Sequence, residues 1–129
     1  MLRRPKKRND RQFGRQGEEI AAEYLSSRGY TILSRNFRGC GCEIDIIAAE
    51  GDDTIVFVEV KRRMNSDFGS PADSVNRAKQ KRIIRAAQAF TSAHRLDDAY
   101  FRFDVIAVSG DGAGSEELTH YEGAFLLSR

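Results

Sequence analysis

The feature that most constrains the fold of this chain is a pair of strand-like runs between residues 42 and 62. Residues 42–49 and 54–62 are rich in β-branched side chains, and the Glu-Gly-Asp-Asp sequence between them is typical of a turn. We therefore predict a hairpin in which Ala49 faces Ile55, a register inferred from the symmetry of the loop. A slip of one residue would exchange the two faces, so this register decides which side chains meet.

The rest of the chain places one helix before this hairpin and one after it. The first helix carries apolar side chains at helical spacing, and Gly29 ends it. The predicted elements follow in chain order: helix 15–28, strands 30–37, 42–49 and 54–62, a helix from near Pro71 or Asn76 to His94, and strands 99–108 and 118–127. Residues 65–70 and 110–114 are predicted as loops. The order αβββαββ predicts an α/β fold.

A length of 129 residues suits a single domain. Residues 1–12 lack hydrophobic periodicity, so we expect a disordered basic tail, followed by one domain over residues 13–129. No apolar run approaches the ~18 residues of a membrane span, and polar residues follow the basic start instead of a signal sequence. We therefore expect a cytoplasmic protein with no membrane partner.

The two cysteines, Cys40 and Cys42, are separated by one residue. A disulfide between them would close a small, strained ring. They would also make only half of a zinc site, and the chain has only His94 and His120 to complete it. This spacing favours two free thiols in a reducing compartment, and their role stays open.

The net charge of +2 conceals an uneven distribution along the chain. Residues 12–60 carry four basic and nine acidic residues, whereas residues 61–95 carry nine basic and two acidic residues. Such asymmetry indicates a polyanion as a partner. The alternative is a solvated helix face together with a disordered start.

The hairpin also brings acidic residues together. Along the first strand, Glu43, Asp45 and Ile47 are predicted to share a face. In the predicted register Asp45 lies opposite Glu59, and Glu43 lies opposite Lys61. Opposed carboxylates destabilise a sheet, so a divalent cation between Asp45 and Glu59 would compensate. Oxygen ligands suit Mg²⁺ or Mn²⁺, and Lys61 could hold an activated water or stabilise charge at phosphorus.

Two alternatives to this metal site remain open. The hairpin could instead carry an ordinary ion pair between Glu43 and Lys61, with Asp45 solvated and Glu59 exposed. Glu18 heads the buried stripe of the first helix and could add a ligand to the metal. An acidic residue in the first turn of a helix is also favoured by the helix dipole alone.

The spacing of these residues resembles a known nuclease pattern. Asp45, a gap of 13 residues and then Glu59-Val60-Lys61 resemble the Asp…Glu-x-Lys motif of the PD-(D/E)xK superfamily. A wider set of residues resembles the YraN family, an uncharacterised bacterial family that is distantly similar to archaeal Holliday-junction resolvases. This set consists of Gly17-Glu18, Leu25, Gly29-Tyr30, Arg35-Asn36-Phe37-Arg38, Glu43 to Ala48, Phe57 to Lys61, Lys79-Gln80 and Phe103-Asp104-Val105. Cys42 stands where the family usually has glycine.

The resemblance implies a restriction-endonuclease-like α/β fold, with a mixed central β-sheet flanked by helices. Asp45 and Glu59 would be metal ligands and Lys61 the catalytic lysine, with Glu18 contributed to the metal site by the first helix. Gln80 matches a polar position turned toward the active site of such proteins. Asp104 matches a recurring position whose role the resemblance does not assign, and Glu43 would support the site.

Three hypotheses about function follow. The first is a metal-dependent endonuclease that hydrolyses DNA phosphodiester bonds and is selective for structure, such as branched or damaged DNA, because no basic motif with interleaved aromatic residues suggests base reading. The second is a non-catalytic protein that retains the nuclease fold and binds DNA or RNA. The third is a homodimer that pairs through residues 121–127. In the first two, the phosphate contacts would come from Arg62, Arg63, Lys79, Lys81, Arg82 and Arg85.

Overall fold

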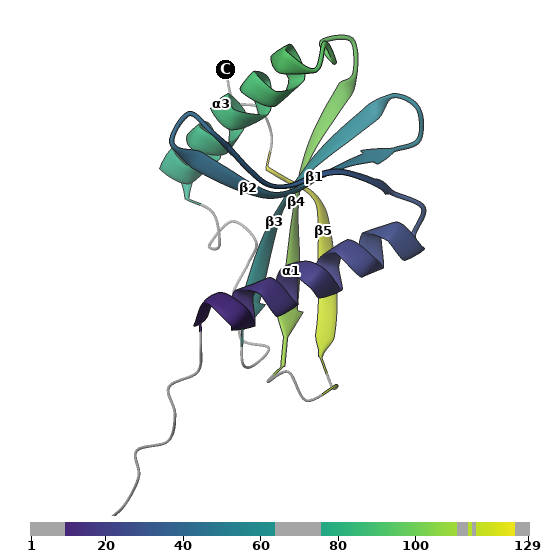
Figure 1. The fold of residues 1–129 in the computed structure, drawn as a ribbon, viewed down its shortest axis with the longest axis vertical. Helices are drawn as coiled ribbons and strands as arrows, with labels where there is room; N and C mark the ends of the chain where they lie inside the picture. The colour runs from purple at the N-terminus through teal and green to yellow at the C-terminus, as the bar shows by residue number, and fades with distance from the viewer. Residues whose placement is uncertain (1–9, 64–75, 111–113, 115, 126–129) are drawn as a thin grey trace, which may run out of the picture.

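Five strands form one mixed sheet, and a helix covers each of its faces (Figure 1). The computed structural model describes residues 10–63, 76–110, 114 and 116–125. The elements are α1 (Asp10–Ser27), β1 (Thr31–Gly39), β2 (Cys42–Glu50), β3 (Thr54–Arg63), α3 (Arg77–Ala93), β4 (Tyr100–Ser109) and β5 (Glu117–Phe125). The strands lie in the order β1-β2-β3-β4-β5, and only β3 and β4 pair in parallel. The predicted αβββαββ order and mixed sheet are confirmed, consistent with an α/β nuclease-like fold.

Two apolar layers hold the helices to the sheet. The α3-side core joins α3 to one face of the sheet through Ile83, Ala86, Ala87, Phe90, Ile44, Ile47, Ile55, Phe57, Phe103, Val105 and Phe125. The α1-side core joins α1 to the other face through Ala21, Ala22, Leu25, Tyr30, Ile46, Ala48, Val56, Val58, Ile106 and Val108. Alternate residues of β3 and β4 enter different cores, because side chains along a strand point to opposite faces.

The ends of the elements differ from the predicted ones by a few residues. Helix α1 begins at Asp10, so the predicted tail overlaps its first residues, and residues 1–9 lie outside the described part of the chain. Helix α3 follows Asn76, whose Oδ1 accepts a hydrogen bond of 2.9 Å from the backbone nitrogen of Lys79. Pro71, the predicted loop at residues 65–70 and most of the loop at 110–114 lie outside the described residues. None of the helices described is both long and apolar enough to cross a membrane.

Strand β2 separates from β3 partway along its length. Ala49 pairs with Ile55 as predicted, but the ladder ends at the pair Ile46–Val58. Asp45 is therefore not paired across the ladder with Glu59, nor Glu43 with Lys61, and that part of the prediction is wrong. The remainder of β2 stays paired with β1 as far as Cys42, so β2 leaves β3 to follow its other neighbour.

The alternation of faces along β2 is interrupted at the same point. Ile44 packs into the α3-side core and Ile46 into the α1-side core, although strict alternation would give them the same face. Ile47 also enters the α3-side core, whereas Asp45 and Glu43 gather beside Glu18 of α1. The predicted shared face of Glu43, Asp45 and Ile47 is therefore wrong, because it assumes a regular strand.

Candidate metal centre

The candidate site occupies the opening between β2 and β3, and Asp45 lies at its centre. Oδ2 of Asp45 accepts a hydrogen bond of 2.8 Å from the backbone nitrogen of Val60. This nitrogen lies beyond the end of the β2–β3 ladder, so the carboxylate supplies the partner that backbone pairing no longer provides. The separation of the strands thus positions Asp45 and leaves the backbone nitrogen of Val60 available to its carboxylate.

The surroundings of Asp45 disfavour the ionised form of its carboxyl group. Burial, followed by the nearby charge of Glu59, raises the pKa of Asp45 to about 8, and Glu18 and Glu43 add to the shift. The bond from Val60 opposes the shift without cancelling it. Without a cation beside it, Asp45 therefore favours its protonated form more than an aspartate in water does.

Three carboxylates meet on the α1 side of the opening. One oxygen each from Glu18, Glu43 and Asp45 lies within 4.8 Å of the others, and we call these three residues the acid cluster. Burial raises the pKa of Glu18, and its hydrogen bond with Asp45 offsets only part of this shift. In the part of the chain that the structure describes, neither Glu18 nor Asp45 forms an ion pair.

Asn36 of β1 supports the acid cluster. With its amide oriented to satisfy hydrogen bonding, its nitrogen donates to Glu18 Oε2 at 3.1 Å and to Glu43 Oε1 at 2.8 Å. Its backbone has a φ of +55°, a left-handed conformation that asparagine adopts more readily than most residues. This conformation holds one amide group between two carboxylates from different elements.

Gly17 explains how α1 brings Glu18 into the site. A β-carbon at position 17 would lie 3.1 Å from both Cβ and Cδ of Arg62 on β3. Because glycine has no side chain, α1 can pack closely against β3 at this point. The adjacent ion pair between Glu19 and Arg35, at 2.9 Å, also ties α1 to β1.

Glu59 lies on the α3 side of the opening and is in contact with two lysines. It is only 8% exposed. Its Oε1 accepts a short hydrogen bond from Nζ of Lys79 and lies 3.4 Å from Nζ of Lys61. The predicted carboxylate pair is thus divided, with Asp45 in the acid cluster and Glu59 neutralised by ammonium groups.

The pKa values of the two lysines shift in opposite directions. Burial lowers the pKa of Lys61, and the attraction of Glu59 offsets this only in part. Burial also opposes the charge of Lys79, but the hydrogen bond and attraction from Glu59 outweigh it and raise the pKa of Lys79. Lys79 is therefore the more firmly charged partner of Glu59.

The remaining predicted site residues lie in different places. Gln80 is half-buried in the first turn of α3, and its backbone nitrogen donates to the carbonyl of Asn76. Asp104 is fully buried on β4, where it accepts hydrogen bonds from Arg102 at 2.9 Å, His120 at 2.7 Å and the backbone nitrogen of Gly123 at 3.0 Å. No residue of the acid cluster is among the described hydrogen-bond partners of Asp104.

The predicted phosphate-binding residues also differ in exposure. Arg63, Lys81, Arg82 and Arg85 are exposed, and Lys79 is turned toward Glu59. The Arg62 side chain is only 4% exposed, lies over the ring of Phe13 at 4.5 Å and is 3.6 Å from Glu116. Since its guanidinium is enclosed between α1 and β3, Arg62 is not exposed in the way that its predicted contact with phosphate would require.

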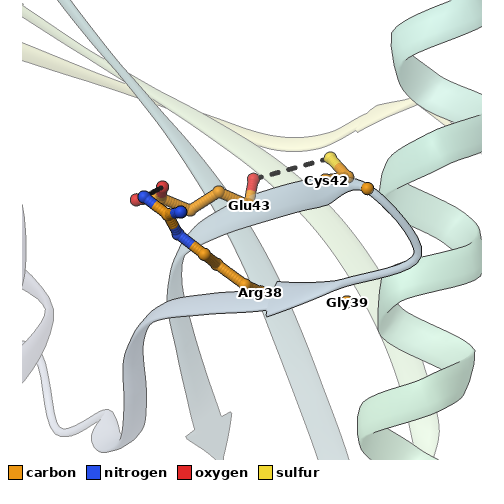
Figure 2. A pocket seen from close by; sticks show the side chains of 5 residues that line it. Arg38, Gly39, Cys42 and Glu43 are labelled. Carbon is orange, nitrogen blue, oxygen red and sulfur yellow. Dashed lines mark hydrogen bonds and ion pairs between the residues drawn. The ribbon is translucent and has the colours of Figure 1, made fainter.

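A pocket adjoins the acid cluster at the turn between β1 and β2 (Figure 2). Its volume is about 370 Å³, and it is lined by Arg38, Gly39, Gly41, Cys42 and Glu43. Figure 2 shows the side chain of Arg38 reaching the carboxylate of Glu43. Nη2 of Arg38 lies 3.4 Å from Oε2 of Glu43, and the Arg38 side chain is 83% exposed. The pocket and the acid cluster therefore share Glu43.

Both cysteines are free thiols beside this pocket. Sγ of Cys42 donates to the carbonyl of Glu43 at 3.6 Å, and Sγ of Cys40 donates to the carbonyl of Arg85 at 3.8 Å. Burial is the main factor that raises the pKa of the Cys42 thiol, and Glu59 adds to it. The contact of Cys40 joins the β1–β2 turn to α3, whereas the contact of Cys42 stays within β2.

The sequence does not predict the roles that two residues, Asn36 and Lys79, have in the site. Asn36 belongs to the segment that carries the YraN resemblance, but nothing in its spacing indicates that it bridges Glu18 and Glu43. Lys79 is predicted to bind phosphate, and only its position next to Gln80, a predicted site residue, indicates that it lies near the site. Both contacts join elements distant in sequence, so local patterns do not reveal them.

Relatives of this chain are found in several bacteria. A UPF0102 protein of Pelobacter propionicus is 44% identical over 121 residues, covering 93% of this chain and 86% of that protein. A UPF0102 protein of Myxococcus xanthus is 40% identical over 124 residues, covering 96% and 97% of the two chains. One from Chlorobium chlorochromatii is 52% identical over 100 residues, covering 76% of this chain and 74% of that protein.

Residues 17–108, which include the whole acid cluster, Glu59 and both lysines, match the uncharacterised protein family UPF0102. This range begins at Gly17, the residue that lets α1 approach β3, and ends at Val108 near the end of β4. The match spans well over half of the chain, and the relatives align over most of their own length. The protein therefore belongs to the UPF0102 family, the YraN family that its sequence resembles.

Proposed function

We propose that this protein is a metal-dependent endonuclease that hydrolyses phosphodiester bonds in DNA. The observation that carries the proposal is the acid cluster at the opening between β2 and β3, with Glu59 and Lys61 beside it. The cluster concentrates carboxylates, and its half-buried central member carries a raised pKa and has no ion-pair partner among the described residues. Perturbed carboxyl groups gathered in this way are typical of functional sites.

The donor set fits a hard divalent cation. Glu18, Glu43 and Asp45 offer carboxylate oxygens, which Mg²⁺ and Mn²⁺ prefer, and their separations allow one ion to contact all three. A bound ion would supply an activated water and neutralise charge at the phosphate. Binding would also favour the ionised form of Asp45, since a carboxyl group must be ionised to ligate a metal.

Lys61 is the residue of this chain best placed to act on the phosphate. Its side chain is 18% exposed and reaches the site from the same strand as Glu59. An ammonium group held in a partly buried site stabilises negative charge more strongly than one in water. We assign to Lys61 the stabilisation of the charge that develops at phosphorus.

The exposed basic residues of α3 give the protein a surface for the DNA backbone. Lys81, Arg82 and Arg85 are exposed on this helix, and Cys40 of the β1–β2 turn contacts the Arg85 carbonyl. Lysine and arginine contacts to phosphate bind nucleic acid without reading its sequence. We therefore propose selectivity for DNA structure, such as branched or damaged sites.

The test is cleavage of branched, single-stranded and duplex DNA in the presence of Mg²⁺ or Mn²⁺. Asp45→Asn should reduce cleavage by at least about a hundredfold, because it removes the central carboxylate. Asp52→Asn, in the exposed turn between β2 and β3, is the matched control and should cleave like the wild type. Equal cleavage by the wild type and the Asp45→Asn/Lys61→Ala double variant would exclude the proposal.

A second candidate is a protein that binds nucleic acid without cleaving it. The contact of Glu59 with both Lys61 and Lys79 favours this candidate, because one predicted metal ligand is already neutralised by the protein itself. Binding would then weaken steeply with salt and would be unaffected by a chelator. Loss of all measurable activity upon addition of EDTA would exclude this candidate.

A further inference from the structure

Lys79 is held in place at both its backbone and its side chain. Its backbone nitrogen donates to Asn76, which caps α3, and its ammonium group donates to Glu59. Its side chain is 30% exposed, whereas Arg77, two residues earlier in the same turn, is exposed. The first turn of α3 therefore extends one specific cation into the opening between β2 and β3.

Positive charge in the site is unevenly distributed. Lys61 and Lys79 both approach the same oxygen of Glu59, while the acid cluster has one ion-pair partner among the described residues, the exposed Arg38. A divalent cation and an ammonium group repel each other, so each weakens the binding of the other to a shared carboxylate. As long as Lys79 stays on Glu59, that carboxylate therefore attracts a cation in the acid cluster less strongly.

We propose that Lys79 is an exchangeable counter-ion that competes with the divalent metal for Glu59. In the resting protein the metal would be held by the acid cluster alone. Glu59 would become a ligand only when a phosphate of the nucleic acid attracts the ammonium of Lys79 away from it. The first turn of α3 would thus couple substrate binding to completion of the metal site. This inference rests on the proposed metal-dependent function.

The first test follows each carboxyl group of the wild-type protein by carbon-13 NMR during a titration with Mg²⁺ alone. Resonances of Glu18, Glu43 and Asp45 should shift, and that of Glu59 should stay constant. Adding a short DNA duplex should then shift Glu59 as well. If Glu59 shifts together with the acid cluster before DNA is added, Lys79 does not withhold it. If no acid-cluster resonance responds to Mg²⁺, the proposed metal-dependent function itself fails.

The second test measures Mn²⁺ affinity by calorimetry without nucleic acid. Lys79→Met should bind Mn²⁺ roughly five- to tenfold more tightly than the wild type, because Glu59 loses a competing cation. Lys79→Arg, which keeps the charge, should restore the wild-type affinity. Unchanged or weaker binding by Lys79→Met would overturn the inference.

A matched control separates this competition from a general loss of positive charge. Arg77→Met removes one charge from the same turn of α3 and should leave Mn²⁺ affinity unchanged, because Arg77 is exposed. Adding Glu59→Gln to Lys79→Met should cancel the gain in affinity. If Arg77→Met tightens binding as much as Lys79→Met does, the effect is long-range electrostatics and the inference is wrong.

Discussion

Asp45 and Asp104 are both enclosed carboxyl groups on the central sheet, but their surroundings have opposite effects. Asp104 is surrounded by donors: Arg102, His120 and a backbone nitrogen together hold its pKa below the usual value, although burial alone would raise it. Asp45 has only one backbone donor, and burial together with three neighbouring carboxylates raises its pKa to about 8. A buried acid with matched donors stabilises a fold, whereas one set among like charges indicates a site that requires a cation.

The first prediction breaks the donor network of Asp104. Asp104→Asn should destabilise the protein by about 3–5 kcal/mol, because it removes the buried carboxylate that binds both Arg102 and His120 and leaves Arg102 with only the more exposed Glu50 and Glu122. Urea unfolding followed by circular dichroism measures the change. Asp97→Asn, at an exposed position before β4, is the control and should change the free energy of unfolding by less than about 0.5 kcal/mol. A loss near that of the control would mean that the network contributes little to stability.

The second prediction uses pH to separate the two acids. Because the pKa of Asp45 is raised in the folded state to about 8, its contribution lowers stability as pH rises from the unfolded pKa of about 4 toward 8. Asp104 has a lowered folded pKa, so its contribution is present above about pH 4 and is lost as pH falls further.

In a metal-free buffer, Asp45→Asn should therefore gain stability relative to the wild type as pH rises, by roughly 3–4 kcal/mol between pH 5 and pH 8. Asp104→Asn should instead lose most of its disadvantage only below about pH 4. Denaturant unfolding at several pH values measures both trends. Parallel pH profiles for Asp45→Asn and the wild type would contradict the raised pKa of Asp45.

The third prediction concerns the position of α1, which carries Glu18 to the acid cluster around Asp45. Gly17→Ala should cost about 1 kcal/mol in the free energy of unfolding, because the added β-carbon presses on Arg62. It should also weaken Mn²⁺ binding, since Glu18 follows directly on the displaced helix. Gly14→Ala is the matched control, since a β-carbon there meets nothing within 4 Å, and it should stabilise the helix by about 0.5–1 kcal/mol. Equal effects of the two substitutions would show that Gly17 does not set the position of α1.

The regular parts of the fold could be predicted from local patterns. The alternation of Phe57, Glu59 and Lys61 against Val56, Val58 and Val60 specifies both faces of β3, because the period of a strand is two. The turn residues between β2 and β3 led to the observed register of Ala49 with Ile55. The acidic residues of the hairpin could likewise be predicted as site residues, because carboxylates that gather among apolar side chains repel one another unless a cation binds them.

The arrangement within the site could not be predicted in the same way. The register alone places Asp45 against Glu59, yet β2 leaves β3 after Ile46, and the two carboxylates come to lie on different sides of the opening. Where a strand leaves one neighbour depends on its pairing with the other, here β1, whose residue Asn36 has a left-handed backbone. Such a choice involves segments far apart in the chain.

The sequence by itself therefore determined the order of elements, the faces of β3 and the identity of the acids and Lys61. Only the tertiary structure decided that Glu18, Glu43 and Asp45 form one group, that Lys79 binds Glu59 and that Arg62 is enclosed. The reason is that periodicity is a property of adjacent residues. The direction of a long charged side chain depends instead on which partner from another element offers the opposite charge.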